Sequence, residues 1–228
     1  DNFIGTTKRG LYGDVIKEID WSIGQLTAAI RDAGIEKNTL LLFSSDNGPW
    51  NPDSATYLRG LKFSNFEGGQ RVPTILWWPG EIAAGRTTDR LGATIDILPT
   101  LASIGEFEYQ SRDGSPVDGV DLSDLWMGRS NESPRKDFYY YGATCTPKPQ
   151  GIRDGRWKLL LKARKRKDTK QERLPYLFDL ESDEQETTNV AEQHPEVVNS
   201  LTLKIETFEK RIIDLKRPAW TPAKNNRN

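Results

Sequence analysis

A short apolar run that ends in a polar turn constrains the fold of this chain more than any other feature. Residues 39–50 read TLLLFSSDNGPW, so the apolar run leads directly into Asp46 and Asn47. A run that is apolar on both faces is typical of a central strand in a parallel sheet with helices on each side. The sequence therefore predicts an α/β arrangement around residues 39–45.

The neighbouring segments support this interpretation. Between residues 15 and 33, isoleucine and leucine recur at spacings of three and four, and Gly34 follows as a stop, which predicts an amphipathic helix. Residues 72–80 predict a second strand, and residues 94–105 predict a helix entered or broken at Pro99. An alternation of helices and strands is typical of an α/β domain.

The pattern changes near Pro134, where we place a domain boundary that divides the chain into 1–134 and 135–228. Residues 106–136 are rich in Gly, Ser, Asp and Pro, around one short helical candidate, DLSDLWMG. Beyond them, DFYYYG, QGIRDGRWKLLLK and LPYLFDLES are rich in strand-forming residues, and Asp154-Gly155 is a hairpin signal. A helix beginning near Pro195 carries an apolar stripe. We expect it to cover a small antiparallel sheet.

Composition excludes several functional classes. The net charge is −1, so the chain lacks the basic excess with which proteins bind nucleic acid. No run approaches the roughly 20 apolar residues that span a bilayer, and we expect no membrane partner. With one cysteine, Cys145, and one histidine, His194, the chain forms no internal disulfide and no thiolate–imidazole zinc site.

The residues after the first predicted strand are candidates for metal binding. In open α/β sheets, ligands bind at the carboxyl ends of strands, where Asp46 and Asn47 would lie. Their carboxylate and carboxamide offer the hard oxygen atoms that calcium or magnesium prefers, although Asp-Asn-Gly-Pro is also good turn chemistry. The following segment, residues 57–73, combines glycines with Lys62. Glycine allows close backbone approach to an anion, and lysine supplies a positive charge.

These residues resemble the sulfatase family, of the arylsulfatase type in the alkaline-phosphatase-like superfamily. The resemblance rests on GLYGDVIKEIDWSIGQL, TLLLFSSDNGPW, LRGLKFSNFEGGQRVPTILWWPG, IDILPTLASIG and a final block that begins GIRDGRWKLLL, and it covers almost the whole chain. It implies an α/β fold: the C-terminal part of an alkaline-phosphatase-like sheet with flanking helices. A small antiparallel sheet packed by a C-terminal helix would complete it.

The resemblance also implies a site. Asp46 and Asn47 match calcium ligands, and Lys62 matches a catalytic lysine that contacts the sulfate. In the family, the nucleophile is a formylglycine made from the Cys or Ser of a Cys-x-Pro-x-Arg motif. Its hydrated aldehyde attacks sulfur, and calcium acts as a Lewis acid. The implied substrates are sulfated small molecules or glycans, and the implied location is periplasmic, secreted or lysosomal.

The chain departs from the family pattern at its single cysteine. Pro147 follows Cys145 at the proper spacing, but Pro149 stands where the motif requires arginine, so Cys145 is not the nucleophile. His194 precedes the last predicted helix, and we expect a surface or helix-entry role for it. We therefore expect the 228 residues, which begin without a leader, to be the C-terminal part of a longer sulfatase. Alone they should be inactive.

Two alternatives remain open on the sequence. A phosphate or phosphonate ester hydrolase of the same superfamily is one, because sulfate and phosphate are both tetrahedral anions. A noncatalytic relative that binds sulfated glycans through the basic run 162–173, KARKRKDTKQER, is the other. If the run has no binding function, it is a solvated loop.

Overall fold

A computed structural model describes residues 2–51, 57–109, 117–142, 148–162 and 174–215. The chain forms two compact units, of which one contains Asp1–Gln110 with Val117–Lys136 and the other contains Asp137–Asn228. The domain assignment from the sequence, 1–134 and 135–228, stays a prediction. Cys145 and most of the basic run, 163–173, lie outside the described residues.

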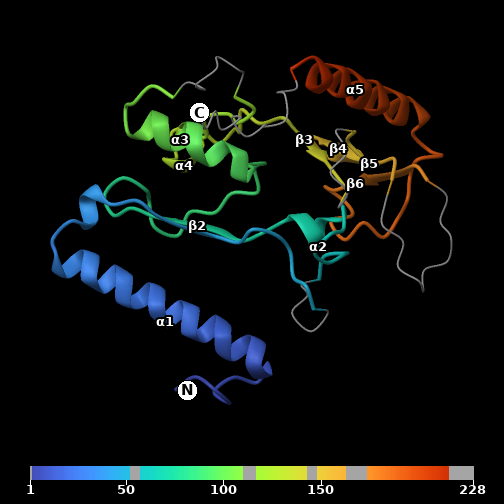
Figure 1. Ribbon diagram of the computed structural model, residues 1–228. Helices are drawn as coiled ribbons and strands as arrows, with labels where there is room; N and C mark the ends of the chain where they lie inside the picture. The colour runs from blue at the N-terminus through green and yellow to red at the C-terminus, as the bar shows by residue number, and fades with distance from the viewer. Residues whose placement is uncertain (1, 52–56, 110–116, 143–147, 163–173, 216–228) are drawn as a thin grey trace, which may run out of the picture. The chain divides into compact units, whose positions relative to one another are not determined.

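The first unit contains the α/β segment (Figure 1). Its elements in chain order are α1 (Gly10–Asp32), η1 (Glu36–Asn38), β1 (Leu41–Ser44), α2 (Glu67–Gln70), β2 (Thr74–Trp77), η3 (Thr94–Asp96), α3 (Ile97–Ile104) and α4 (Ser123–Trp126). The predicted helices and both predicted strands are therefore confirmed. Pro99 lies in the first turn of α3, where its missing N–H costs no helical hydrogen bond.

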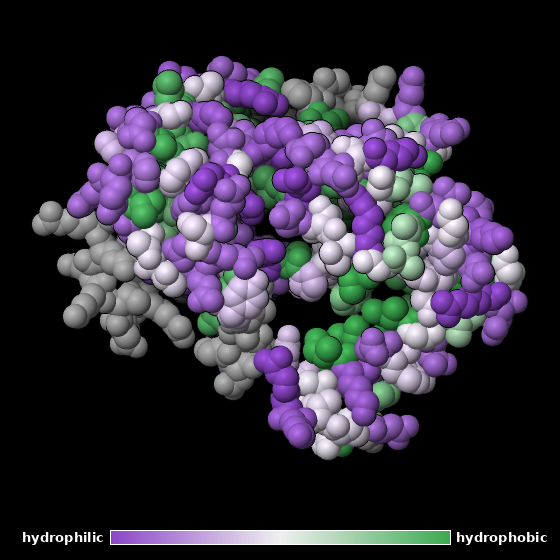
Figure 2. Space-filling view, turned by 180° about the vertical axis from the view of Figure 1, so that it is seen from behind, coloured by the Kyte–Doolittle hydropathy of each residue, from purple (hydrophilic) through white to green (hydrophobic). Residues whose placement is uncertain are grey.

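The long helix α1 ends as its sequence predicts. Gly34 has a φ of 69°, and its N–H donates to the carbonyl oxygen of Arg31, while Ile35 donates to Ile30. This pair of bonds is a Schellman motif, which takes glycine at the left-handed position. The apolar stripe of α1 is largely exposed, and hydrophobic residues are visible on the surface in Figure 2. The exposed apolar side chains of α1 include Leu11, Val15, Ile16, Trp21 and Leu26.

The strands β1 and β2 correct one expectation. They pair antiparallel, with Leu42 opposite Leu76, and β1 is half-buried along its length. Within the part of the chain that the structure describes, β1 has no parallel neighbour, so the predicted central position in a parallel sheet is not observed. An apolar run indicates that both faces of a strand are to be covered, but it does not specify the direction of the neighbouring strand.

The beginning of α3 is held by a buried carboxylate. Each carboxylate oxygen of Asp96 accepts two hydrogen bonds. Oδ2 accepts from the N–H of Ala93 at 2.8 Å and from Arg135 Nε at 2.6 Å. Oδ1 accepts from the N–H of Val120 at 2.8 Å and from Arg135 Nη2 at 2.5 Å. Asp96 has no exposed surface. This cluster joins three segments that lie far apart in the sequence.

The second unit is a sheet of four antiparallel strands with one helix on it. The strands β3 (Asp137–Tyr140), β4 (Gly151–Asp154), β5 (Trp157–Leu160) and β6 (Tyr176–Asp179) neighbour one another in chain order, and α5 spans Pro195–Asp214. The hairpin signal is confirmed, because Gly155 has a φ of 58° in the tight turn that joins β4 to β5. The buried core of this unit is Ile152, Leu159, Leu177, Leu201 and Ile205.

Trp77, Trp78 and Trp157 have structural roles. Trp78 donates its indole N–H to the carbonyl oxygen of Lys37, and Trp77 forms part of β2. Trp157 packs against the core of the second unit and lies 5.0 Å from the ring of His194, which precedes α5. No helix among the described residues is both long enough and apolar enough to cross a bilayer.

Candidate functional site

The candidate site begins where β1 ends. Asp46 and Asn47 follow the strand after Ser45, and Ser45 Oγ donates to the carbonyl oxygen of Asn47 at 3.1 Å. Asp46 is exposed and Asn47 is half-buried. A carboxylate and a carboxamide therefore lie together on a short turn at the carboxyl end of a strand, as the sequence predicts.

Backbone hydrogen bonds join this turn to the segment that carries Lys62. The N–H of Lys62 donates to the carbonyl oxygen of Pro49 at 2.8 Å, and the N–H of Gly48 donates to the carbonyl oxygen of Gly69 at 3.1 Å. These two bonds connect residues separated by 13 and 21 positions in the sequence. The structure thus brings the segment containing Asp46 and Asn47 beside the segment containing Lys62.

Gly48 and Gly68 have a different use from the one expected. A Cβ on Gly48 would lie 2.0 Å from the carbonyl oxygen of Gly68, and a Cβ on Gly68 would lie 2.6 to 2.7 Å from three carbonyl oxygens. Their nearest neighbours are thus carbonyl oxygens of this chain, which repel an anion. The glycines allow two loops to pack backbone to backbone, and Lys62 is the residue among those predicted that supplies positive charge.

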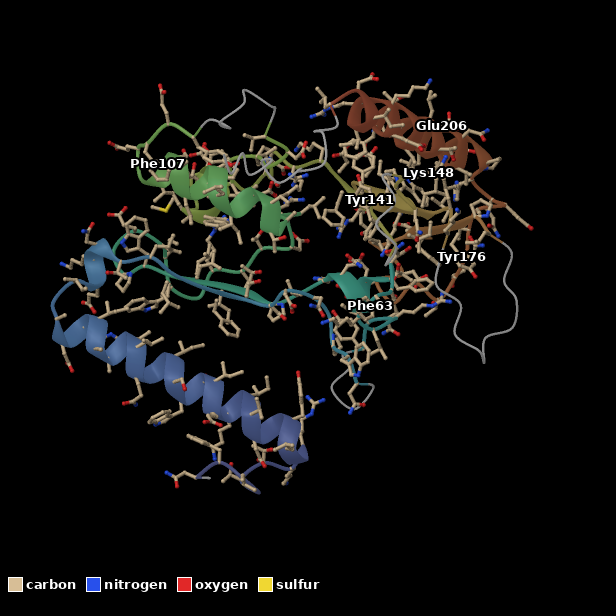
Figure 3. All side chains as sticks on the ribbon, viewed as in Figure 1. Phe63, Phe107, Tyr141, Lys148, Tyr176 and Glu206 are labelled. Carbon is tan, nitrogen blue, oxygen red and sulfur yellow. The ribbon has the colours of Figure 1, made fainter. Side chains whose placement is uncertain are left out.

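Lys62 lies in a tight turn. The N–H of Ser64 donates to the carbonyl oxygen of Leu61 at 2.9 Å, so Lys62 and Phe63 are the central residues of a β-turn. Lys62 is half-buried, and its Nζ lies 5.7 Å from the centre of the Phe63 ring. Figure 3 labels Phe63 on the segment that leads into α2. A turn closed by a backbone bond limits the positions open to the lysine.

Two further cations belong to this part of the chain. The guanidinium carbon of Arg59 lies 4.1 Å from the centre of the Phe66 ring, a cation–π contact, and Arg71 follows α2 at an exposed position. Glu67, the first residue of α2, is buried. The segment that carries Lys62 thus also contains the cations Arg59 and Arg71 and the buried carboxylate of Glu67.

Asp46 and Asn47 could supply only some of the ligands of a metal ion. Asp46 and Asn47 offer two hard oxygen donors, whereas calcium takes about six to eight. Within the described ranges, no group of three or more His, Cys, Asp or Glu side chains could hold a metal ion. The donor chemistry fits two ligands of a calcium site, and a complete site needs further oxygen atoms.

Sequence reasoning missed two aromatic residues at this site, Trp50 and Phe63. Their rings lie 5.7 Å apart, nearly perpendicular to each other. Trp50 follows Pro49, and Phe63 follows Lys62, so both are adjacent in sequence to the bond that joins the two loops. The pairing of these two positions depends on a contact between distant segments, which no local pattern reveals.

Two family models match the sequence. The model described as Sulfatase matches residues 3–106, and the model described as N-sulphoglucosamine sulphohydrolase, C-terminal, matches residues 62–211. The two ranges together include every candidate site residue and extend over both compact units as far as residue 211. The second match alone spans well over half of the chain.

Known proteins show the same relationship. The chain is 40% identical over 150 residues to N-acetylgalactosamine-6-sulfatase of Sus scrofa and 38% identical over 147 residues to arylsulfatase A of Bos taurus. Each alignment covers 62% of this chain and 28% of the relative. The chain thus spans little more than a quarter of the length of these relatives.

Solved structures confirm the predicted fold class. A Bacteroides thetaiotaomicron protein designated BT33336S-sulf, from work on glycosaminoglycan metabolism, superimposes with a TM-score of 0.76 at 29% identity. The superposition covers 92% of this chain and 47% of that protein. The α/β segment, the small antiparallel sheet and the C-terminal helix therefore belong to one known architecture.

Proposed function

Because this chain belongs to the sulfatase family, we propose that the whole protein containing it hydrolyses aryl or carbohydrate sulfate esters. The observation that carries the proposal is the pair of backbone bonds that holds Lys62 beside the turn of Asp46 and Asn47. These bonds bring the segment that carries a lysine beside the segment that carries two hard oxygen donors, which supports binding of a cation together with a tetrahedral anion.

Asp46 and Asn47 would hold a calcium ion through their side-chain oxygens. Bound calcium would supply positive charge that polarises the sulfate oxygens. The two residues fit this role because their oxygens are hard donors next to each other on an accessible turn. The remaining ligands would come from residues outside this sequence.

Lys62 would bind a sulfate oxygen and stabilise the negative charge that develops on the sulfate or on the leaving oxygen. A fixed positive group stabilises such charge without reorganisation at the moment of reaction. The backbone bond from Ser64 to Leu61 closes the turn from which the Lys62 side chain extends, and this supports the proposed role.

The formylglycine nucleophile would also come from outside this sequence, since no Cys-x-Pro-x-Arg motif occurs in it. Cys145 lacks the arginine of that motif. The 228 residues alone should therefore show no turnover of a sulfate ester. By family resemblance, we further propose a periplasmic, secreted or lysosomal location.

The test is to assay the whole protein with 4-nitrocatechol sulfate and with 4-nitrophenyl phosphate. We expect hydrolysis of the sulfate ester, and we expect Lys62→Ala to lower kcat/KM by about 10²- to 10³-fold. Asp46→Ala should weaken the dependence of the rate on added calcium. Lys17→Ala, which removes an exposed cation from α1, is the matched control and should leave the rate unchanged.

Other outcomes identify the alternatives. Faster hydrolysis of the phosphate ester would favour a phosphate or phosphonate ester hydrolase. A whole protein that hydrolyses neither ester but binds heparin in a salt-sensitive manner would favour a noncatalytic glycan-binding role for the basic run 162–173.

A further inference from the structure

We propose that Trp50 and Phe63 form an aromatic subsite that binds the ring of the substrate's leaving group, beside the sulfate held at Lys62. This inference rests on the proposed function and names the residues that would contact the ring of an aryl or pyranose sulfate ester. Its basis is the geometry and exposure of the two rings.

The two rings make a right-angled corner at the site. Their centres lie 5.7 Å apart and their planes meet at 84°, an edge-to-face pair. Trp50 is 70% exposed and Phe63 is 47% exposed, so both offer ring surface to a ligand. Two flat walls at right angles can contact the face and the edge of one ring.

The corner is held close to the candidate sulfate lysine. Lys62 Nζ lies 5.7 Å from the centre of the Phe63 ring. Trp50 follows Pro49, whose carbonyl oxygen accepts a hydrogen bond from the N–H of Lys62, so the backbone at Trp50 is held near Lys62. A ring against the aromatic corner would therefore present a sulfate substituent to Lys62.

The backbone at Phe63 supports a functional reason for the side chain. Its φ is 71°, at the third position of the turn, where a type II turn favours glycine. A bulky residue in the left-handed region is strained, and such strain concentrates at functional sites. A strained and nearly half-exposed phenylalanine next to Lys62 supports a role of its ring in ligand binding.

The positive charge at the corner favours an anionic ring compound over a neutral one. Lys62 Nζ lies 5.7 Å from the centre of the Phe63 ring, which is one of the two rings of the corner. A neutral ring would use the aromatic surface alone. A sulfated ring would use the aromatic surface and the positive charge together.

The test uses the whole protein with substitutions at both rings. Trp50→Ala and Phe63→Gly should each raise the KM for 4-nitrophenyl sulfate by about three- to tenfold, the usual effect of losing one aromatic contact. The inhibition constant of inorganic sulfate, which has no ring, should change less than about twofold, because Lys62 is retained. Phe63→Tyr, which keeps the ring, should behave as wild type.

A folding measurement separates binding from packing. Phe63→Gly should leave the thermal unfolding midpoint unchanged or raise it, since glycine relieves the positive φ. Phe107→Ala is the matched control: it removes an aromatic side chain of the same unit that is 53% exposed, and it should not alter KM.

The failures are distinguishable. If the wild-type protein neither hydrolyses 4-nitrophenyl sulfate nor binds inorganic sulfate, the proposed function fails and the subsite fails with it. If the wild type is active and both ring substitutions leave KM unchanged, the subsite alone is refuted. A large fall in the unfolding midpoint of both variants, with unchanged KM, would show that the rings serve packing.

Discussion

Removal of the Asp96 carboxylate should loosen the first unit at the beginning of α3. The carboxylate accepts two backbone N–H bonds and two bonds from Arg135, whose side chain is 9% exposed. In Asp96→Ala, the buried guanidinium would lose both of its bonds to the carboxylate, and two backbone N–H groups would lose their acceptor. Breaking a buried ion pair in this way costs about 3 to 5 kcal/mol, a large part of the stability of a typical domain.

The assay is urea denaturation of Asp96→Ala, Arg135→Ala and the double variant, combined with amide hydrogen exchange of peptides that contain Ala93 and Val120. We expect the double variant to be less destabilised than the sum of the single variants by about 1 to 3 kcal/mol, because the second substitution removes the buried charge that has lost its bonds to Asp96. Exchange at both peptides should accelerate in Asp96→Ala.

A matched control is the exposed pair of Asp124 and Arg129 in the same unit. Its side chains are 70% and 59% exposed and lie 2.8 Å apart, so Asp124→Ala should cost less than about 1 kcal/mol. The reasoning would be refuted if Asp96→Ala cost no more than this control, or if the two single variants summed to the double variant within about 0.5 kcal/mol.

Three further predictions concern other parts of the chain. Gly68→Ala should abolish sulfate ester hydrolysis by the whole protein, because the new Cβ would collide with three carbonyl oxygens. Gly24→Ala is the control: its Cβ would meet no atom within 4 Å on α1, and the substitution should raise the thermal unfolding midpoint. Ile205→Ala should destabilise the second unit by about 2 to 5 kcal/mol in urea denaturation, since Ile205 is buried in its core. The N–H of Gly5 holds the pKa of Asp14 below its ordinary value of 3.8, so this contact stabilises the fold above that pH and is lost as the pH falls through the lowered pKa. The amide resonance of Gly5 in NMR should report the loss, and Asp14→Asn should remove the pH dependence.

Local pattern was sufficient where one segment determines its own structure. The spacing of apolar residues identified α1 and α5, Gly34 identified the end of α1, and Gly155 identified the hairpin between β4 and β5. Each of these features depends on φ preference or on one-sided burial within a few residues. The site candidates Asp46, Asn47 and Lys62 also came from the sequence, and their roles stay predictions.

The pairing of strands that are distant in the sequence, and other distant contacts, could not be predicted from such patterns. The direction of β1 relative to β2 depends on how the chain returns, and the pattern of β1 is the same for either direction. The corner of Trp50 and Phe63 likewise exists because a backbone bond joins Pro49 to Lys62 across 13 positions. The pattern of residues within one segment does not indicate which distant segment will contact it in the folded protein.

Lys158 in the second unit is another residue whose strand the sequence predicts and whose burial it does not. The sequence predicted a strand in GRWKLLLK, and β5 spans Trp157–Leu160, but a lysine in a strand is normally exposed. Here Lys158 has no exposed surface, and its Nζ lies 2.8 Å from Oε1 of Glu186, which is also fully buried. The sequence by itself determined the helices, the strands, the hairpin and the family, because these follow from local preferences and motifs. Only the tertiary structure decided which charges are buried and which loops meet, because a buried charge requires a partner that folding alone brings to it.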